Sequence, residues 1–124
     1  PAGRFVLSDV VASETPRSDS TLQTLEMLRD PSHVRDHSIN QWQTMLTGAG
    51  FKPSVALRFD VPLHFGNWVA RINTPPNLIQ ALRDLFTGLP DTQRNELGLP
   101  DDLPPDNDFT FKLLGAVIVG ERGA

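Results

Sequence analysis

The sequence contains no cysteine among its 124 residues. This absence excludes a disulfide scaffold, a thiolate metal site and a cysteine nucleophile. It also fits a reducing compartment, although exported proteins can lack cysteine as well.

Basic charge and long apolar runs are scarce too. The chain has 11 basic against 15 acidic side chains, a formal net charge of -4. This balance argues against a protein whose main role is to grip phosphate backbones. The longest nearly apolar run, residues 113–119, is too short to span a bilayer. We therefore predict a cytoplasmic protein that binds neither nucleic acid nor membranes.

The sequence has the composition of a globular protein, with 39% hydrophobic and 21% charged residues. Its length fits one small domain, residues 1–124. Three apolar segments rich in β-branched residues, 4–11, 54–61 and 109–119, are predicted as strands, and helical patterns separate them. Strands separated by helices are typical of the α/β class.

The first and last predicted strands are apolar at both alternating sets of positions. This pattern predicts strands that are buried on both faces of a parallel or mixed sheet. A buried strand needs a neighbour on each side, and a sheet of three strands does not supply enough of them. The sequence therefore resembles part of a larger sheet.

Local signals place the helix ends. Residues 18–20 can each cap a first helix, which Pro31 ends at or before the preceding residue. Ser38 with Gln41 three residues later forms a capping box, and Gly50 is suited to end that helix. Thr74 is the predicted cap of a later helix, in which two prolines occupy the first turn.

Four segments, taken in order, resemble class I S-adenosylmethionine-dependent methyltransferases. Residues 1–9, PAGRFVLSD, are similar to the PGGRFVLSD turn and fifth strand of that family. Residues 28–38 resemble the segment that follows this strand in bacterial members. Residues 42–51 resemble the helix before the sixth strand, and residues 109–120 the seventh, antiparallel strand. The closest group is the small-molecule enzymes of the ubiquinone and menaquinone biosynthesis type.

The resemblance implies a partial Rossmann-like sheet of three strands, with the third strand antiparallel between the other two. It also implies an intact enzyme that transfers a methyl group from S-adenosylmethionine to a small molecule. The family's glycine-rich turn and the acidic residue at the end of its second strand are absent from this chain. We therefore expect the chain to correspond to a C-terminal half that binds no cofactor and is inactive alone.

The resemblance also suggests site residues. His33 is the candidate catalytic base for an oxygen acceptor, because histidine titrates near neutrality. Arg29, Arg35, His37 and Trp68 are the candidate substrate-binding residues. The alternatives are a solvent-facing segment with paired charges for the polar residues and a core position for the tryptophan.

Two further predictions concern cofactor and metal. Asp9 lies at the carboxyl end of the first strand, where ligands collect in α/β sheets, and is the candidate cofactor contact. A turn cap is an equally good interpretation of Asp9. His33 and His37 are four residues apart near carboxylates, but Pro31 interrupts the helix that would align them. We therefore predict no metal site.

A second functional interpretation is a non-catalytic α/β module that dimerises or binds a ligand. If the first strand lies at an edge, its amides and carbonyls are free to pair with another strand. The expected partners are a second copy of the chain or a missing N-terminal half, together with a small-molecule acceptor.

Overall fold

The computed structural model describes residues 3–103 and 108–122. The chain divides into two compact units. The sheet unit contains residues 3–19, 36–61 and 114–122, and the helical unit contains residues 20–35, 62–103 and 108–113. The order of elements is β1 (Gly3–Val10), α1 (Pro16–Arg29), α2 (Ile39–Gly48), β2 (Lys52–His64), α3 (Phe65–Ala70), α4 (Pro76–Thr87), α5 (Asp91–Glu96) and β3 (Thr110–Arg122).

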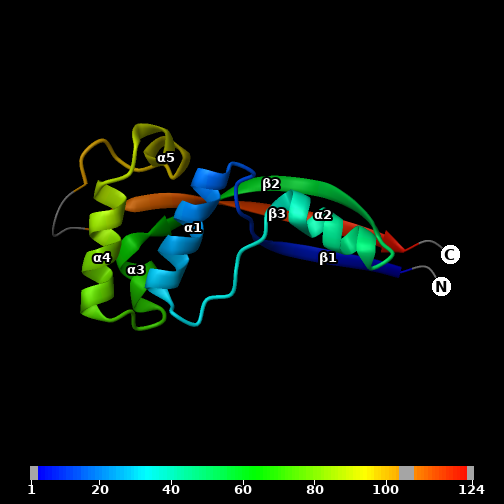
Figure 1. Cartoon of the computed structure of the whole chain (residues 1–124), viewed down its shortest axis with the longest axis horizontal. Coiled ribbons are helices and arrows are strands. Elements are labelled where there is room, and N and C mark those ends of the chain that lie inside the picture. Colours follow the sequence, from blue (N-terminus) through cyan, green and yellow to red (C-terminus); the bar gives the residue numbers. More distant parts are fainter. Residues whose placement is uncertain (1–2, 104–107, 123–124) are drawn as a thin grey trace. The chain divides into compact units, whose positions relative to one another are not determined.

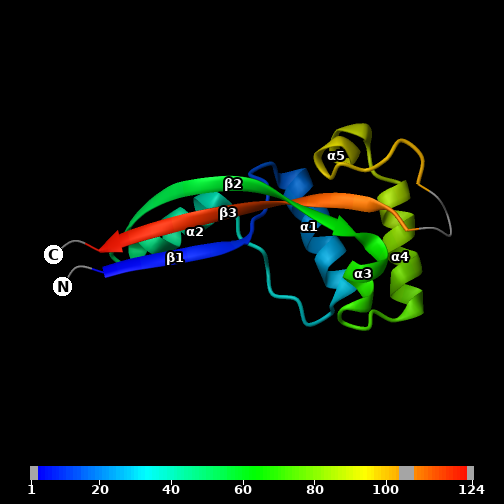
Figure 2. The same ribbon diagram turned by 180° about the vertical axis from the view of Figure 1, so that it is seen from behind.

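The sheet has three strands in the order β1-β3-β2, so β3 is the central strand (Figure 2). β1 pairs with β3 in antiparallel register, from Gly3 opposite Arg122 to Val10 opposite Gly115. The prediction of a three-stranded sheet, with the last strand in sequence antiparallel between the other two, is confirmed.

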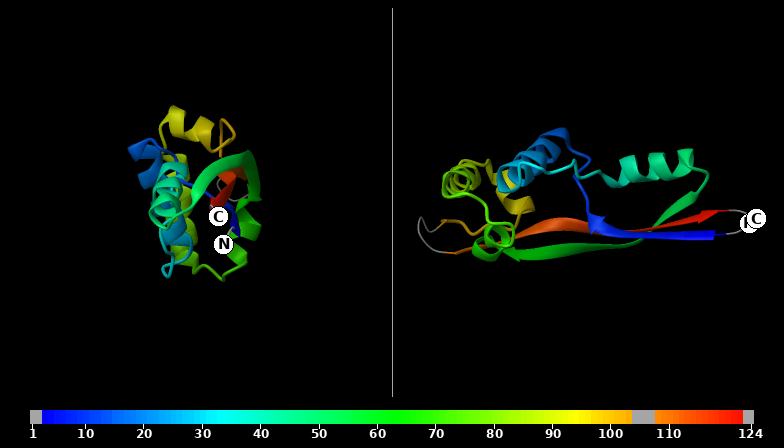
Figure 3. Two further views of the ribbon diagram at one scale, coloured as in Figure 1. Left: turned by 90° about the vertical axis from the view of Figure 1, so that its right-hand side faces the viewer. Right: turned by 90° about the horizontal axis from the view of Figure 1, so that it is seen from below.

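One face of this sheet is covered by α2 (Figure 3). Leu7 and Ile118 are directly opposed in the register and project on that face, because opposed residues share a face of the sheet. Ile118 is fully buried. The core of the sheet unit consists of Val11, Leu46, Ala116 and Ile118, with Leu7, Ile39, Trp42 and Phe51 packed against it.

The first strand was predicted to be an interior strand of a larger sheet, and the described residues place it at an edge. β1 has β3 on one side and lies at the edge of the sheet in the described residues. Val6 is 59% exposed and Phe5 is 40% exposed. The apolar pattern of β1 is that of an interior strand, whereas its position is that of an edge strand.

The ends of α2 follow the sequence prediction. The hydroxyl of Ser38 accepts a hydrogen bond from the amide of Gln41, whose side chain accepts one from the amide of Ser38. Gly50, just beyond the helix, has φ of 92°. This left-handed conformation favours glycine and ends the helix, as predicted.

Two other predicted caps are wrong. α1 begins at Pro16, before residues 18–20, since a proline fits the first helical position, where its missing N–H costs no bond. The N-cap of α4 is Pro75. The hydroxyl of Thr74 instead donates to the carbonyl of Arg29 at 2.8 Å.

The helical unit has an aromatic core. The rings of Phe65 and Phe109 stack with centroids 4.7 Å apart, and Trp68 meets Phe111 edge-on at 5.0 Å. Phe86 of α4 contacts all four of these rings. α1, α3 and α4 surround this core (Figure 1). None of the helices within the described residues has the length and hydrophobicity needed to cross a bilayer.

Candidate functional site

A cavity of about 300 Å³ lies at the carboxyl end of β1, within the sheet unit. Ligands of open α/β sheets collect at such strand ends. The cavity is lined by Val11, Ala12, Ser13, Glu14, Thr15, Ile39, Arg58, Leu114 and Gly115.

Residues 11–15 form one wall of this cavity, and backbone hydrogen bonds hold the start of this segment in place. The amide of Val11 donates to the carbonyl of Leu114 on β3 at 2.9 Å. The amide of Ala12 donates to the carbonyl of His37 at 3.0 Å. The segment is therefore held by the central strand on one side and by the residues that precede α2 on the other.

The cavity combines an apolar interior with charged residues. Val11 and Ala12 are each 3% exposed. One carboxylate oxygen of Glu14 accepts the amide of Asn40 at 3.0 Å, in the first turn of α2, where the helix dipole stabilises negative charge. Arg58 of β2 brings a positive charge to the same lining. Such a site suits a small molecule with an apolar body and a polar group.

Asp9 lies just before this cavity and is not part of its lining. Its Oδ1 accepts the amide of Val10 at 2.7 Å, so the carboxylate closes the end of its own strand. This bond agrees with the turn-cap interpretation. A cofactor contact at Asp9 stays a prediction.

The segment that follows β1 lacks the features of a cofactor-binding turn. β1 leads directly into residues 11–15, and no glycine-rich turn occurs there. The amides of Val11 and Ala12 are bonded to protein carbonyls. They are therefore not available to a cofactor.

The helical unit contains two predicted substrate-binding residues, Arg29 and Trp68, which contact each other. The Arg29 Nε donates to the Trp68 carbonyl at 2.8 Å, and the guanidinium lies 4.9 Å from the indole ring centre. Burial lowers the pKa of Arg29, and the neighbouring Glu26 carboxylate opposes that shift. Trp68 is 2% exposed, in agreement with the core alternative. Substrate contact at Trp68 requires its surroundings to open.

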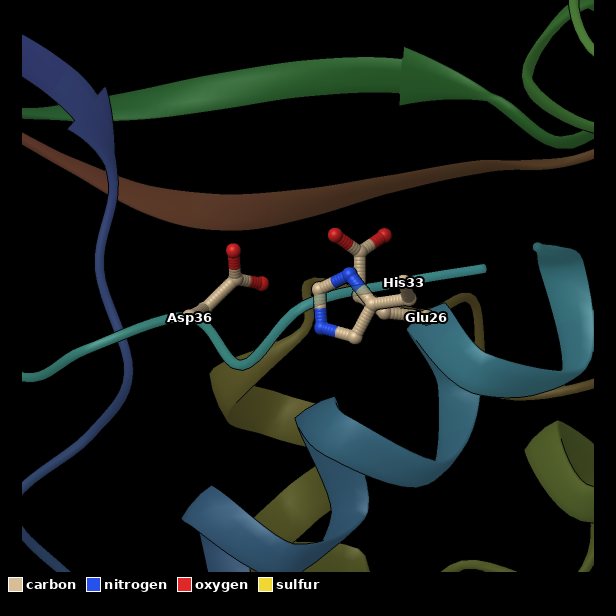
Figure 4. Close-up of side chains that lie close together, drawn as sticks. All are labelled: Glu26, His33 and Asp36. Atoms are coloured by element: carbon tan, nitrogen blue, oxygen red, sulfur yellow. The ribbon is translucent and has the colours of Figure 1, made fainter. Parts of the chain in front are cut away.

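His33 lies beside α1 in the same unit. Its Nε2 is 3.3 Å from the side-chain oxygen of Gln23. A carboxylate oxygen of Glu26 lies within 4.8 Å of a ring nitrogen of His33, and Figure 4 shows that carboxylate beside the ring. Asp36, also labelled there, belongs to the sheet unit, where it begins the stretch of residues 36–61. The roles of His33 as a base and of the chain as metal-free stay predictions.

The two remaining predicted residues, Arg35 and His37, belong to different units of the chain. Arg35 is exposed and ends this stretch of the helical unit. His37 belongs to the sheet unit, where its ring meets Trp42 edge-on with centroids 5.2 Å apart. Substrate binding by Arg35 and His37 stays a prediction.

Sequence reasoning missed Glu14 and Arg58. Ligands collect beyond strand ends, and the sequence prediction placed that point at Asp9, whereas β1 ends at Val10. Extending that rule by a few residues identifies Glu14. No sequence signal distinguishes Arg58 from the other exposed charges of β2.

Comparison with known proteins adds a family relationship to this geometry. No family model matches the chain. The uncharacterized protein YafE of Escherichia coli (strain K12) is 40% identical over 83 residues, which are 67% of this chain and 40% of YafE. The uncharacterized methyltransferase YcgJ of Bacillus subtilis (strain 168) is 37% identical over 73 residues, which are 59% of this chain and 29% of YcgJ.

Solved structures agree with these relatives. The crystal structure of YcgJ from Bacillus subtilis superimposes on this chain with a TM-score of 0.91 and 27% sequence identity. The superposition covers 98% of this chain and 52% of the YcgJ chain. The structure of the BH2331 protein from Bacillus halodurans C-125 superimposes with a TM-score of 0.90 and 23% sequence identity, over 99% of this chain and 57% of the BH2331 chain. At this low identity the similarity establishes the fold alone.

The chain has the sequence and fold of the C-terminal part of a class I methyltransferase. The resemblance drawn from the sequence motifs is thereby confirmed. The chain spans about half the length of the solved structures that it matches, and a smaller share of the curated relatives.

Proposed function

We propose that the chain forms the acceptor-binding part of an S-adenosylmethionine-dependent methyltransferase that acts on a small molecule. The observation that carries this proposal is its likeness to YcgJ, which is described as a methyltransferase and shares the fold over 98% of the chain. The proposal keeps the cytoplasmic location that the absence of cysteine suggested.

The cavity beyond β1 is the proposed acceptor site. Methyl transfer is an in-line displacement, so the protein contributes chiefly by positioning the acceptor and excluding water. Val11 and Ala12 provide apolar contacts, and Glu14 and Arg58 provide charges that orient a polar group. His33, the candidate base from the sequence, belongs to the helical unit and does not line this cavity.

The chain by itself is proposed to be inactive. The residues that hold the cofactor in the family, a glycine-rich turn and an acidic side chain at the end of the second strand, have no counterpart here. The matched structures contain about as much chain again beyond the part that superimposes.

Calorimetric titration with S-adenosylmethionine tests the proposal that the chain alone does not bind the cofactor. We expect no measurable heat of binding to the isolated chain at cofactor concentrations in the micromolar range. Micromolar binding by a single folded copy would contradict the claim that the cofactor site lies elsewhere.

A chimera with YafE tests the proposal that the chain is part of a methyltransferase. The 83 matched residues of YafE are replaced by the corresponding residues of this chain, and intact YafE is the matched control. We expect the chimera to bind S-adenosylmethionine with an affinity within about tenfold of YafE, a difference of about 1.4 kcal/mol. If YafE binds the cofactor and a folded chimera does not, the assignment to methyltransferases is wrong.

A further inference from the structure

Two charged side chains line the cavity beyond β1, and their surroundings differ. Glu14 comes from the segment after β1 and Arg58 from β2, and every lining residue belongs to the sheet unit. One Glu14 carboxylate oxygen accepts the amide of Asn40 in the first turn of α2, where the helix dipole favours negative charge. The protein itself therefore stabilises the charge of Glu14.

The charge of Arg58 has no such partner. Its side chain is exposed, and its guanidinium forms neither an ion pair nor a hydrogen bond within the part of the chain that the structure describes. A guanidinium presents its N–H donors in a planar fork, which matches the two oxygens of a carboxylate. The unbalanced charge of the cavity is therefore positive, and its donors are available to a ligand.

The wall between these charges is apolar. Leu114 of β3, whose carbonyl accepts the amide of Val11, is 48% exposed although its side chain is large and apolar. A ligand that covers Leu114 removes this surface from water, which is favourable. The turn beside it is held in shape, because the hydroxyl of Ser13 accepts the amide of Thr15 at 3.1 Å. The cavity thus offers a ligand a fixed apolar surface next to a cation.

The size of the cavity limits the ligand. Its volume is about 300 Å³. Since a water molecule occupies about 30 Å³, such a volume holds roughly ten water-sized groups. A ligand of this size is a single ring or a short branched chain with one polar group.

We propose that the methyl acceptor is a small monocarboxylic acid with an apolar body. This inference rests on the proposed function, because it takes the cavity as the acceptor site. The carboxylate pairs with the Arg58 guanidinium, and the apolar body covers Leu114. Glu14 repels a second negative charge, so the cavity prefers a carboxylate to a phosphate ester, which carries close to two charges at neutral pH.

Titration of the chain followed by NMR tests this preference with three probes that share a phenyl ring. Benzoate should shift the amide signals of Val11, Ala12 and Leu114, and should bind about fivefold more tightly than benzamide, its uncharged analogue. Phenyl phosphate should bind more weakly than benzoate. The preference for benzoate over benzamide should decrease when sodium chloride is added, because salt screens an exposed ion pair.

Three variants assign the preference to particular side chains. Arg58→Gln should reduce the affinity for benzoate to that for benzamide. Lys52→Gln is the matched control, since it removes one positive charge from the same strand outside the cavity lining, and it should keep the preference. Glu14→Gln keeps an oxygen that can accept the Asn40 amide, and should raise the affinity for phenyl phosphate more than that for benzoate. Circular dichroism establishes that each variant is folded.

Four results overturn the inference. The first is that no probe shifts the cavity amides, and the second is equal affinity for benzoate and benzamide. The third is a benzoate preference that Arg58→Gln leaves intact or that Lys52→Gln removes equally. The fourth is tighter binding of phenyl phosphate than of benzoate, which would assign the cavity to a phosphorylated compound.

These titrations involve neither S-adenosylmethionine nor methyl transfer. The acid can therefore be wrong while cofactor binding by the YafE chimera still supports the methyltransferase assignment. Conversely, a folded chimera that fails to bind the cofactor removes that assignment, whatever the affinity for benzoate. The two failures are thus distinguishable.

Discussion

Gly115 of β3 lies directly beneath the ring of Phe59 on β2. A β-carbon placed there would lie 2.4 Å from Cε2 of the Phe59 ring. We therefore expect Gly115→Ala to lower the free energy of unfolding by about 1–3 kcal/mol, because the ring or the strand must shift. Urea unfolding followed by circular dichroism measures the change.

Gly48→Ala is the control for this substitution. No atom lies within 4 Å of a β-carbon at Gly48, the last residue of α2. The control should change stability by less than about 0.5 kcal/mol. An equal loss in Gly115→Ala and Gly48→Ala would show that the Phe59 contact is not the cause.

Asp30 gives a prediction for the dependence on pH. The hydroxyl and the amide of Ser32 both donate to Asp30 Oδ1, at 2.7 and 3.0 Å. These two bonds, the hydroxyl first, lower the pKa of Asp30 below its ordinary value of 3.8. Ser32→Ala removes the larger contribution, so we expect the pKa of Asp30 to rise toward 3.8. Carboxyl titration by NMR measures it.

The sign of the linked effect follows from the direction of this shift. The folded-state pKa is depressed, so any stabilisation by the Asp30 carboxylate is present above its ordinary pKa. It is lost as the pH falls through the lowered value. Ser54→Ala, far along the chain in β2, is the control. An Asp30 titration that is the same in both variants would refute the assigned role of Ser32.

Among the elements, α2 depends most clearly on a local signal. Ser38 and Gln41 form both bonds of the capping box, and Ser38 is 5% exposed. We expect Ser38→Ala to destabilise the chain by about 1 kcal/mol, since the amide of Gln41 loses its acceptor. Thermal unfolding measures the loss.

Two companion variants isolate the cap. Ser38→Asp retains an acceptor and should recover most of the stability. Thr44→Ala lies on the exposed surface of the same helix and should be close to neutral. If Thr44→Ala costs as much as Ser38→Ala, helix propensity rather than capping explains the result.

Sequence reasoning located this element because its signals are local. Ser38, Gln41 and Gly50 act within one turn of the helix that they bound. The same kind of local signal predicted Thr74 as a helix cap, and this prediction is wrong. The Thr74 hydroxyl instead donates to the carbonyl of Arg29, which is distant in sequence. A cap prediction assumes that the side chain has no better partner elsewhere, and that condition depends on tertiary structure.

At the scale of the whole molecule, the two units differ in their cores. The core of the helical unit contains a cluster of five aromatic rings and the fully buried Leu25 and Leu82. The sheet unit has a smaller core and an open edge at β1. We therefore expect the sheet unit to lose its structure at a lower urea concentration than the helical unit.

The two tryptophans allow each unit to be followed separately. Trp42 lies in the sheet unit and Trp68 in the helical unit. The fluorescence of Trp68→Phe, which retains Trp42, should change at a lower urea midpoint than that of Trp42→Phe. Circular dichroism of both variants controls for effects of the substitutions. Coincident fluorescence midpoints would instead indicate a single cooperative transition.

The sequence by itself determined the class of fold, the capped α2 helix and the resemblance to methyltransferases, and that resemblance implied the central antiparallel strand. Each of these rests on periodicity, on neighbouring residues or on contiguous motifs, which a linear sequence displays. Tertiary structure alone decided that β1 is an exposed edge and that Glu14 and Arg58 line one cavity. It also decided that Asp9 closes its own strand. The physical reason is that strand neighbours and cavity walls come from segments far apart in the chain, and only folding brings them together.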